Sequence, residues 1–175
     1  MKALVIFTIS LLLTTIALAE TETLKYDDNK PDGKKSIAGS GEMIMFTMPE
    51  GGTAVKAVRI HGSRYGEKKA PKEDFLIYFL NEDGSKIIHT EKVPYKKFKD
   101  RGKEKWVRIG LDKPVELPKK FWVVLAFDAK QTKGVYVSYD TSTGGKHSKV
   151  GLPNKPAAKV DFKGDWMIRV DVEKE

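Results

Sequence analysis

Apolar and polar side chains alternate with a period of two along most of this sequence, and the helical period of 3.6 is almost absent. Period two is the signature of β-strands, whose successive side chains point to opposite faces of a sheet. Runs rich in Val, Ile, Phe, Tyr and Trp that are bounded by turn residues favour the same structure. The predicted strands are residues 24–27, 42–48, 54–63, 75–80, 86–91, 105–111, 121–127, 135–140 and 165–172.

About nine short strands without helices between them predict two packed antiparallel sheets, that is, an all-β sandwich of the jelly-roll type. Residues 81–85 (NEDGS) are expected to join two strands as a hairpin, with Gly84 at a positive φ. A short helical turn is expected at 95–100. A further short strand near 148–152 would account for the long loop over 141–164.

The first nineteen residues have the three parts of a secretory signal peptide. Lys2 precedes an uncharged run whose most apolar part is LVIFTISLLL, and the run ends on Ala-Leu-Ala before Glu20. The alternative is an N-terminal membrane anchor, for which the run is slightly short. We therefore expect residues 1–19 to be a cleaved signal peptide. Residues 20–175 would then be one secreted or periplasmic domain without a membrane span.

Composition agrees with an exported domain that depends on its hydrophobic core. A domain of this length buries about two-thirds of the surface of its unfolded chain and needs no disulfide, and the sequence has no cysteine. Zinc held by thiolates is thereby excluded. The formal net charge is +8, yet no run of basic residues exceeds two. This favours a solvated basic surface, with weak attraction to anionic polymers as the alternative.

Motifs for catalysis do not occur in the sequence. The three histidines are far apart, the HExxH motif is absent, and Gly39-Ser40-Gly41 lacks the spacing of a nucleophile elbow. We therefore predict that the chain is not an enzyme and has no catalytic residues. A Ser-His-acid triad assembles only in space, so an unrecognised hydrolase remains the third alternative for function.

Calcium is the one cofactor that a short motif suggests. Asp27 and Asp28 lie in an oxygen-rich stretch, but an EF-hand loop starting at Asp28 would have Lys30 at its third place and Gly39 at its twelfth. An Asx-rich turn fits this stretch better. A structural calcium on Asp27 and Asp28 stays open, and no other cofactor is expected.

Residues 133–139 (KGVYVSY) partly match an RNA-stacking motif. Two positions of the motif are wrong, and the surrounding pattern is not βαββαβ. Because the chain also begins with an export signal, the segment predicts a strand, and we expect no nucleic-acid partner.

Alternation also indicates which strands expose a polar face. In 105–111 the apolar positions share one face and Arg108 lies on the other. In 54–63 Val58 and Ile60 point inward, whereas Arg59 and His61 point outward. Residues 121–127 are apolar on both faces, so that strand is either covered twice or lines a groove.

Flat aromatic rings beside a few polar groups are typical of sugar-binding sandwiches, although any single tryptophan is more often a core residue. The three tryptophans are Trp106, Trp122 and Trp166. The candidate ligand-binding residues, which could share one sheet face or its rim, are Arg59, His61, Arg64, Tyr65, Tyr78, Trp122 and Tyr136.

The order of segments resembles a known group of domains. The segments KWVRIGLDKPVELPKKFWVVLAFD and GDWMIRVDV carry the resemblance most strongly, with LKYDD, AGSGEMIMFTMPEG, AVKAVRIHGSRYG, DFLIYFLNEDGS and TKGVYVSYD in the same order. They resemble accessory β-sandwiches of secreted bacterial proteins, similar to jelly-roll, galactose-binding-like modules that often accompany peptidases or other enzymes. The resemblance covers nearly all of the chain after the signal peptide. It implies a fold, but no catalytic residue.

The sequence thus predicts an exported, non-catalytic recognition module for carbohydrate or another cell-envelope component. The alternative is a structural or protein-interaction subunit that docks on an exported enzyme through an exposed strand edge.

Overall fold

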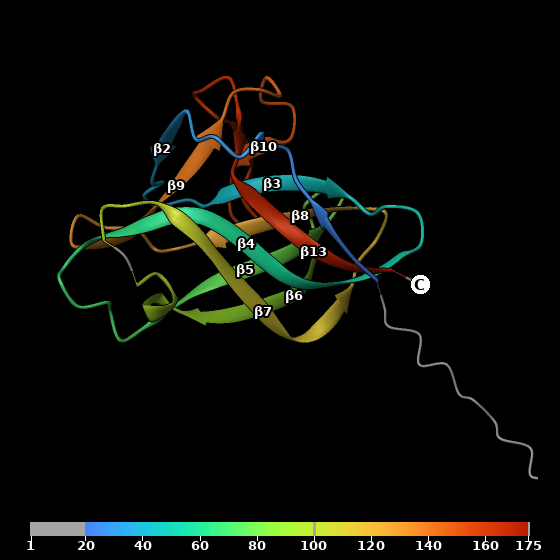
Figure 1. Ribbon diagram of the computed structural model, residues 1–175, viewed down its shortest axis with the longest axis horizontal. Coiled ribbons are helices and arrows are strands. Elements are labelled where there is room, and N and C mark those ends of the chain that lie inside the picture. Colours follow the sequence, from blue (N-terminus) through green and yellow to red (C-terminus); the bar gives the residue numbers. More distant parts are fainter. Residues whose placement is uncertain (1–19, 100, 175) are drawn as a thin grey trace, which may run out of the picture.

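The computed structural model describes residues 20–99 and 101–174, so the predicted signal peptide lies outside the described residues (Figure 1). The strands are β1 (Glu20–Leu24), β2 (Gly33–Lys35), β3 (Glu42–Thr47), β4 (Gly52–Gly66), β5 (Asp74–Asn81), β6 (Ile87–Pro94), β7 (Lys105–Glu116), β8 (Lys120–Ala126), β9 (Lys133–Asp140), β10 (Ser148–Val150), β11 (Ala158–Lys159), β12 (Asp165–Trp166) and β13 (Ile168–Lys174), with one 3-10 turn, η1 (Tyr95–Lys97).

The strands form two sheets whose ladders are all antiparallel, so the predicted all-β sandwich is confirmed. The first sheet has the order β1-β13-β4-β9-β12, with β2 paired to β9 and β7 paired to β4; we call it sheet A. The second has the order β11-β10-β3-β8-β5-β6; we call it sheet C.

The described residues form thirteen strands, so the predicted number of about nine is too low. The segment 165–172 is divided at Met167, whose amide bonds to β9 while its carbonyl accepts from β4. The short strand near 148 is present as β10, as expected. β2 has three residues and β11 has two. Strands this short show no alternation of apolar and polar side chains, so the sequence did not reveal them.

The core lies between the two sheets and comes from the inward positions of both. Ile44 and Phe46 of β3 and Phe121, Val123 and Leu125 of β8 are buried against sheet A. Their partners from sheet A are Val55, Val58, Ile60, Val135, Val137, Ile168, Val170 and Val172. At roughly 25 cal/mol per Å² of buried apolar surface, this core is the main source of stability.

Strand β4 organises sheet A. Its first part pairs with β7 on one side and β13 on the other, and its last residues pair with β9. Figure 1 shows β7, β4 and β13 side by side across one broad face of the molecule. Residues 59, 61, 63 and 65 of β4 therefore point away from the core, because they alternate with buried Val58, Ile60 and Gly62.

The expected turns are present. Residue Gly84 of the β5–β6 hairpin has φ 77°, which a glycine adopts without steric cost. The helical turn near 95–100 is η1, fixed in the core by buried Tyr95 and Phe98. Within the described residues, no helix is apolar and long enough to cross a membrane.

Candidate functional site

The seven predicted ligand-binding residues do not share one face. Residues Arg59, His61, Tyr65 and Tyr136 lie on the outer face of sheet A. Tyr78 and Trp122 lie on the outer face of sheet C, on the opposite side of the sandwich. The expectation of a single site is therefore wrong, because strand alternation fixes the side of a residue relative to its own sheet but not relative to the other sheet.

Arg64 faces the interior. It occupies an even position of β4, opposite core residue Val135, and is only 5% exposed. Its guanidinium donates to the carbonyls of Glu67 and Lys68. This arginine therefore fixes the turn after β4 and is not available to a ligand.

Trp122 belongs to a small second core on the outer face of sheet C. It is 5% exposed and packs with Met43, Leu80 and Val124. Its Nε1 donates to the Glu82 carbonyl at 2.8 Å. Leu152 from the loop after β10 packs against this cluster, so the doubly apolar strand β8 has cover on both sides, which was the first of the two expected alternatives. A cleft of about 350 Å³ borders the cluster and includes Trp122 and Leu152 in its lining.

Three arginines form a row across the outer face of sheet A. Arg59 of β4 lies directly opposite Arg108 of β7 on one side and Arg169 of β13 on the other. Like charges directly opposite one another destabilise a sheet unless counter-charges lie between them. Two aspartates supply those charges.

Asp171 neutralises one part of the row. Its carboxylate, 1% exposed, accepts from Arg59 Nε at 2.8 Å, Arg59 Nη2 at 3.0 Å, Arg108 Nε at 2.9 Å and Thr23 Oγ1 at 2.9 Å. Burial opposes ionisation of Asp171, but the bonds from two guanidinium groups and one hydroxyl outweigh it and hold the pKa of this carboxyl below its usual range. The Arg59–Asp171 ion pair, made through two nitrogens of the arginine, is consequently fixed. Arg108 binds Asp171 only through Nε, and its side chain remains 50% exposed.

Arg169 and Asp27 hold Trp106 in place. Arg169 Nε donates to Asp27 at 2.9 Å, and its Nη2 donates to Asn29 at 3.1 Å. The same Asn29 oxygen accepts from Trp106 Nε1 at 3.2 Å. The guanidinium carbon of Arg169 lies 4.0 Å from the centroid of the indole, a cation–π contact. The Trp106 indole is thus held by Arg169 on one face and by the hydrogen bond from its nitrogen to Asn29.

His61 lies beside Trp106, with ring centroids 5.1 Å apart. Its Nδ1 is 2.8 Å from Ser138 Oγ. Burial lowers the pKa of His61, although the charges of Glu104 and Asp27 act in the opposite direction. Ser138 is fully buried, so a substrate cannot reach its hydroxyl, and this pair does not provide the nucleophile that a hydrolase would need.

The far end of the same face carries two tyrosines whose rings are in contact with their planes tilted by 36°. The rings of Tyr65 and Tyr136 are 4.6 Å apart, and Lys34 Nζ lies 5.4 Å from the Tyr136 ring. Glu104 accepts from Ser63 Oγ at 2.9 Å and pairs with Lys34. This end is polar, and a small hollow of about 220 Å³ is lined in part by Lys34 and Glu104.

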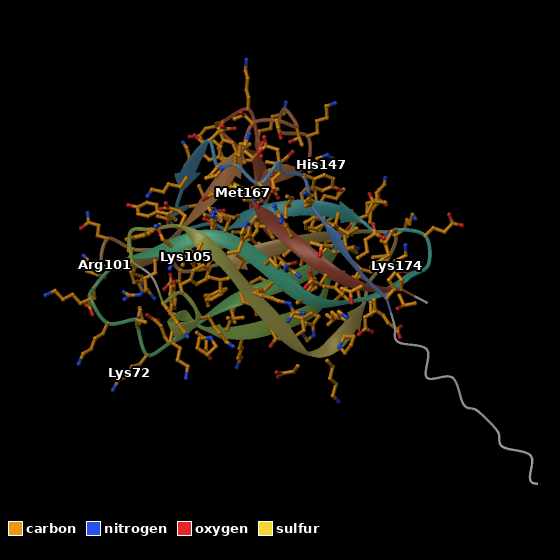
Figure 2. The ribbon with its side chains drawn as sticks, viewed as in Figure 1. Lys72, Arg101, Lys105, His147, Met167 and Lys174 are labelled. Atoms are coloured by element: carbon orange, nitrogen blue, oxygen red, sulfur yellow. The ribbon has the colours of Figure 1, made fainter. Side chains whose placement is uncertain are left out.

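A cleft of about 540 Å³ opens beside Trp106, a volume in the range of small-molecule sites. It lies between β7 and the segment that contains η1. The lining residues are Gly62, Lys96, Lys97, Phe98, Lys99, Lys105, Trp106, Val107 and Arg108. We call it the Trp106 cleft. In Figure 2, Lys105 lies on the same side of the molecule as Arg101 and Lys72, away from Lys174.

Sequence reasoning missed Trp106 as a site residue, although a signal was present. Trp106 precedes Val107 and stands two residues before Arg108, so alternation already placed it on the polar face. The general preference of tryptophan for cores concealed this. Trp166, by contrast, is fully buried, with its Nε1 donating to the Lys149 carbonyl at 3.0 Å.

The two candidate calcium ligands have other partners. The Asp27 carboxylate binds Arg169 and accepts from the Asn29 amide at 3.0 Å, and Asp28 Oδ1 accepts from the Lys30 amide at 2.8 Å. These amide contacts are those of Asx turns. Among the described residues, no three His, Asp or Glu side chains gather in a way that could hold a metal ion.

Comparison with known proteins is informative only at the level of structure. No protein-family model and no curated protein matches the sequence. A solved structure of the clostridial cysteine protease Cwp84 after propeptide cleavage is similar with a TM-score of 0.59 and 11% identity, over 89% of this chain and 40% of that one.

A second structure holds the cysteine protease and lectin-like domains of Cwp84, a surface layer associated protein of Clostridium difficile. It matches with the same TM-score of 0.59 and 11% identity, over 89% of this chain and 36% of that one. The chain thus spans well under half the length of these proteins, and at such low identity the similarity shows a shared fold.

Proposed function

We propose that this protein is a non-catalytic recognition module that binds carbohydrate through the Trp106 cleft. The observation that carries the proposal is the half-buried indole of Trp106, which lines the cleft while Arg169 and Asn29 fix its orientation. Arg169 can cover only one face of the ring. A rigid aromatic surface beside a few placed polar groups is what a sugar ring requires.

The neighbours of the cleft supply hydrogen bonds for hydroxyl groups. Arg108 has terminal nitrogens that its ion pair with Asp171 does not use, and His61 packs against the Trp106 ring. Because Asp171 holds Arg59 and Arg108 in position, little side-chain entropy is lost on binding. The structural similarity to a protein with a lectin-like domain agrees with this role.

The place of action that we propose is outside the cytoplasm. The predicted signal peptide supports it, and Cwp84 is described as a surface layer associated protein. An envelope or extracellular polysaccharide is the corresponding ligand class.

Binding to a glycan array, followed by titration of the best glycan, tests the proposal. Trp106→Ala should abolish binding, and Arg108→Ala should weaken it, without loss of the folded state in circular dichroism. Tyr78→Ala on the outer face of sheet C is the matched control and should bind normally. Normal binding by Trp106→Ala, or loss of binding by Tyr78→Ala alone, would contradict the assignment.

A second candidate function is docking on an enzyme domain, and β6 favours it. Ile87 and Ile88 on this edge strand of sheet C are 40% and 37% exposed, and they are the large apolar residues that the described part of the chain exposes. An apolar edge strand is a template for association. A photo-crosslinker at position 88 should capture one enzyme in a 1:1 ratio, and Ile87→Lys should prevent it while glycan binding is unchanged.

A further inference from the structure

The walls of the Trp106 cleft are strongly basic. Of the described residues that line it, five are lysine or arginine and none is acidic. In the sequence, the segment 96–105 holds six basic residues against two acidic ones, and one of the acids, Glu104, is already bound to Ser63 and Lys34. Among the described lining residues, the exposed Lys96, Lys97 and Lys99 therefore bring positive charge to the cleft, and no described lining residue is acidic.

The fold presents these lysines from a rigid turn. Tyr95 and Phe98 are both 1% exposed, and the Tyr95 hydroxyl donates to the Phe127 carbonyl. Phe98 packs between Phe75 and Phe127. Since the two aromatic anchors point into the core, Lys96, Lys97 and Lys99, which alternate with them, are exposed. The backbone that carries the charges is fixed before any ligand arrives.

We propose that the ligand of the Trp106 cleft is an acidic polysaccharide, whose sugar ring lies on Trp106 and whose carboxylate or phosphate groups contact the lysines of the η1 segment. This inference rests on the proposed function and adds the charge of the ligand to it. Clefts lined by charge of one sign concentrate oppositely charged ligands and accelerate their capture. The exposed position of the lysines makes the interaction sensitive to salt.

A single aromatic ring in the cleft favours a polysaccharide over a single-stranded nucleic acid. Nucleic-acid grooves stack successive bases on several aromatic side chains. Of the two aromatic residues that line the cleft, Phe98 is buried and only Trp106 offers its ring. A nucleic acid is therefore an outcome to be tested, not the ligand that the geometry favours.

The test compares two probes with the same sugar backbone, one charged and one neutral: a hexamer of α-1,4-linked galacturonic acid and its fully methyl-esterified form. Calorimetric titration of the full chain should give tighter binding of the acid form, with an advantage that shrinks at high salt. Lys96→Gln, Lys97→Gln and Lys99→Gln combined should weaken binding of the acid form about tenfold, at about twofold per exposed ion pair. Binding of the ester should be unchanged.

A matched control removes the same charge elsewhere. Lys146 and Lys163 lie in exposed loops and Lys159 is an exposed residue of β11; the segment 146–163 that holds them is drawn at the top of Figure 1, away from η1. Lys146→Gln, Lys159→Gln and Lys163→Gln combined should leave both affinities unchanged. Equal loss in the two triple variants would mean that net charge alone acts, and would overturn the inference. Tighter binding of oligothymidylate than of the acid hexamer would overturn it in favour of a nucleic acid.

Failure of the inference can be told from failure of the proposed function. If acid and ester bind equally well and Trp106→Ala abolishes both, carbohydrate binding stands and the preference for acidic ligands is wrong. If Trp106→Ala binds the acid hexamer as the wild type does, the cleft is not the site, and both proposals fall.

Discussion

The two outer faces of the sandwich each carry a tryptophan, Trp106 on β7, which among the described strands pairs only with β4, and Trp122 on β8, which lies between β3 and β5. The two residues have opposite environments. Trp106 on sheet A lies among arginines and aspartates and lines an open cleft. Trp122 on sheet C lies among Met43, Leu80 and Val124 and is almost fully buried. The difference is set by what packs on each face: Leu152 packs against sheet C, and the ion-paired row lies across sheet A.

The same contrast holds for buried carboxyl groups. Asp171 of sheet A receives two guanidinium groups, which keep it ionised. Glu42 of sheet C points into the core, and its carboxyl group accepts from backbone amides, among them the Ile37 amide at 3.2 Å, but from no cation of the described residues. Burial raises the pKa of Glu42 to about 8, so it is mostly protonated at neutral pH. A carboxyl that is paired with cations and one that is not respond to pH in opposite ways.

The largest expected effect separates the two tryptophans. Trp122→Ala should reduce the free energy of unfolding by about 3–5 kcal/mol, because it leaves a cavity in a closed cluster. Trp106→Ala should reduce it by about 1 kcal/mol, since it removes a cation–π contact and one hydrogen bond from a half-exposed ring. Urea unfolding of both variants measures the two values, and the reverse order would show that the faces have been assigned to the wrong environments.

Glu42 provides the next largest effect, through pH. In the unfolded chain Glu42 ionises near 4.5, whereas in the folded chain its pKa is about 8. The folded state therefore binds the extra proton between these values, and stability is fully present below pH 4.5 and is lost as the pH rises toward 8. The slope reaches at most about 1.4 kcal/mol per pH unit. Glu42→Gln should flatten this decline in unfolding curves recorded from pH 5 to 8; an unchanged slope would exclude Glu42 as its source.

Asp171 should show the opposite sign. Its folded pKa is below the unfolded value, so its contribution is present above the unfolded pKa and is lost as the pH falls through the folded pKa. Asp171→Asn should cost about 2 kcal/mol at pH 7, less than a fully buried pair because the arginines are partly exposed. The stability difference between variant and wild type should shrink below pH 4. A difference that is constant down to pH 3 would mean that the ion pair does not contribute.

The smallest effect concerns the cover of sheet C. Leu152→Ala should cost about 1 kcal/mol, because the side chain is only half-buried. It should also move the fluorescence maximum to longer wavelength, since water then reaches Trp122. Glu50→Ala, at an exposed turn, is the control. If Leu152→Ala has the same fluorescence maximum and the same unfolding midpoint as the wild type, the loop does not cover this face of sheet C.

The predictable part of the structure is the part that depends on neighbours in sequence. The inward positions of β4 and β7 were identified from alternation, and so were the outward positions of Arg59, His61 and Arg108. The hairpin at Gly84 followed from turn chemistry. β2 and β11 escaped prediction because they have too few residues to show a period and form only where a neighbouring strand offers its backbone groups. The strand predicted at 24–27 was wrong in position, since β1 ends at Leu24 and pairs with β13.

The candidate site was predicted only in part, for the same reason. Arg59 and His61 lie on the site face as expected, whereas Trp106 was missed and Trp122 and Tyr78 lie on the other side of the molecule. Arg64 was also misplaced, because counting from the outward residues puts it at an inward position once β4 extends to Gly66. The position of a residue in its strand predicts on which face of the sheet its side chain lies. The order in which strands pair decides which other side chains lie beside it on that face.

By itself, the sequence determined that the chain is built from strands, which side of each strand is apolar and where the tight turns lie, because these depend on local sterics and on a two-residue period. Only the tertiary structure decided which tryptophan is buried and which keeps part of its ring exposed. It also gathered lysines that occur in runs of no more than two into one basic wall. Burial and electrostatic potential are sums over residues distant in sequence, and the fold alone sets their distances.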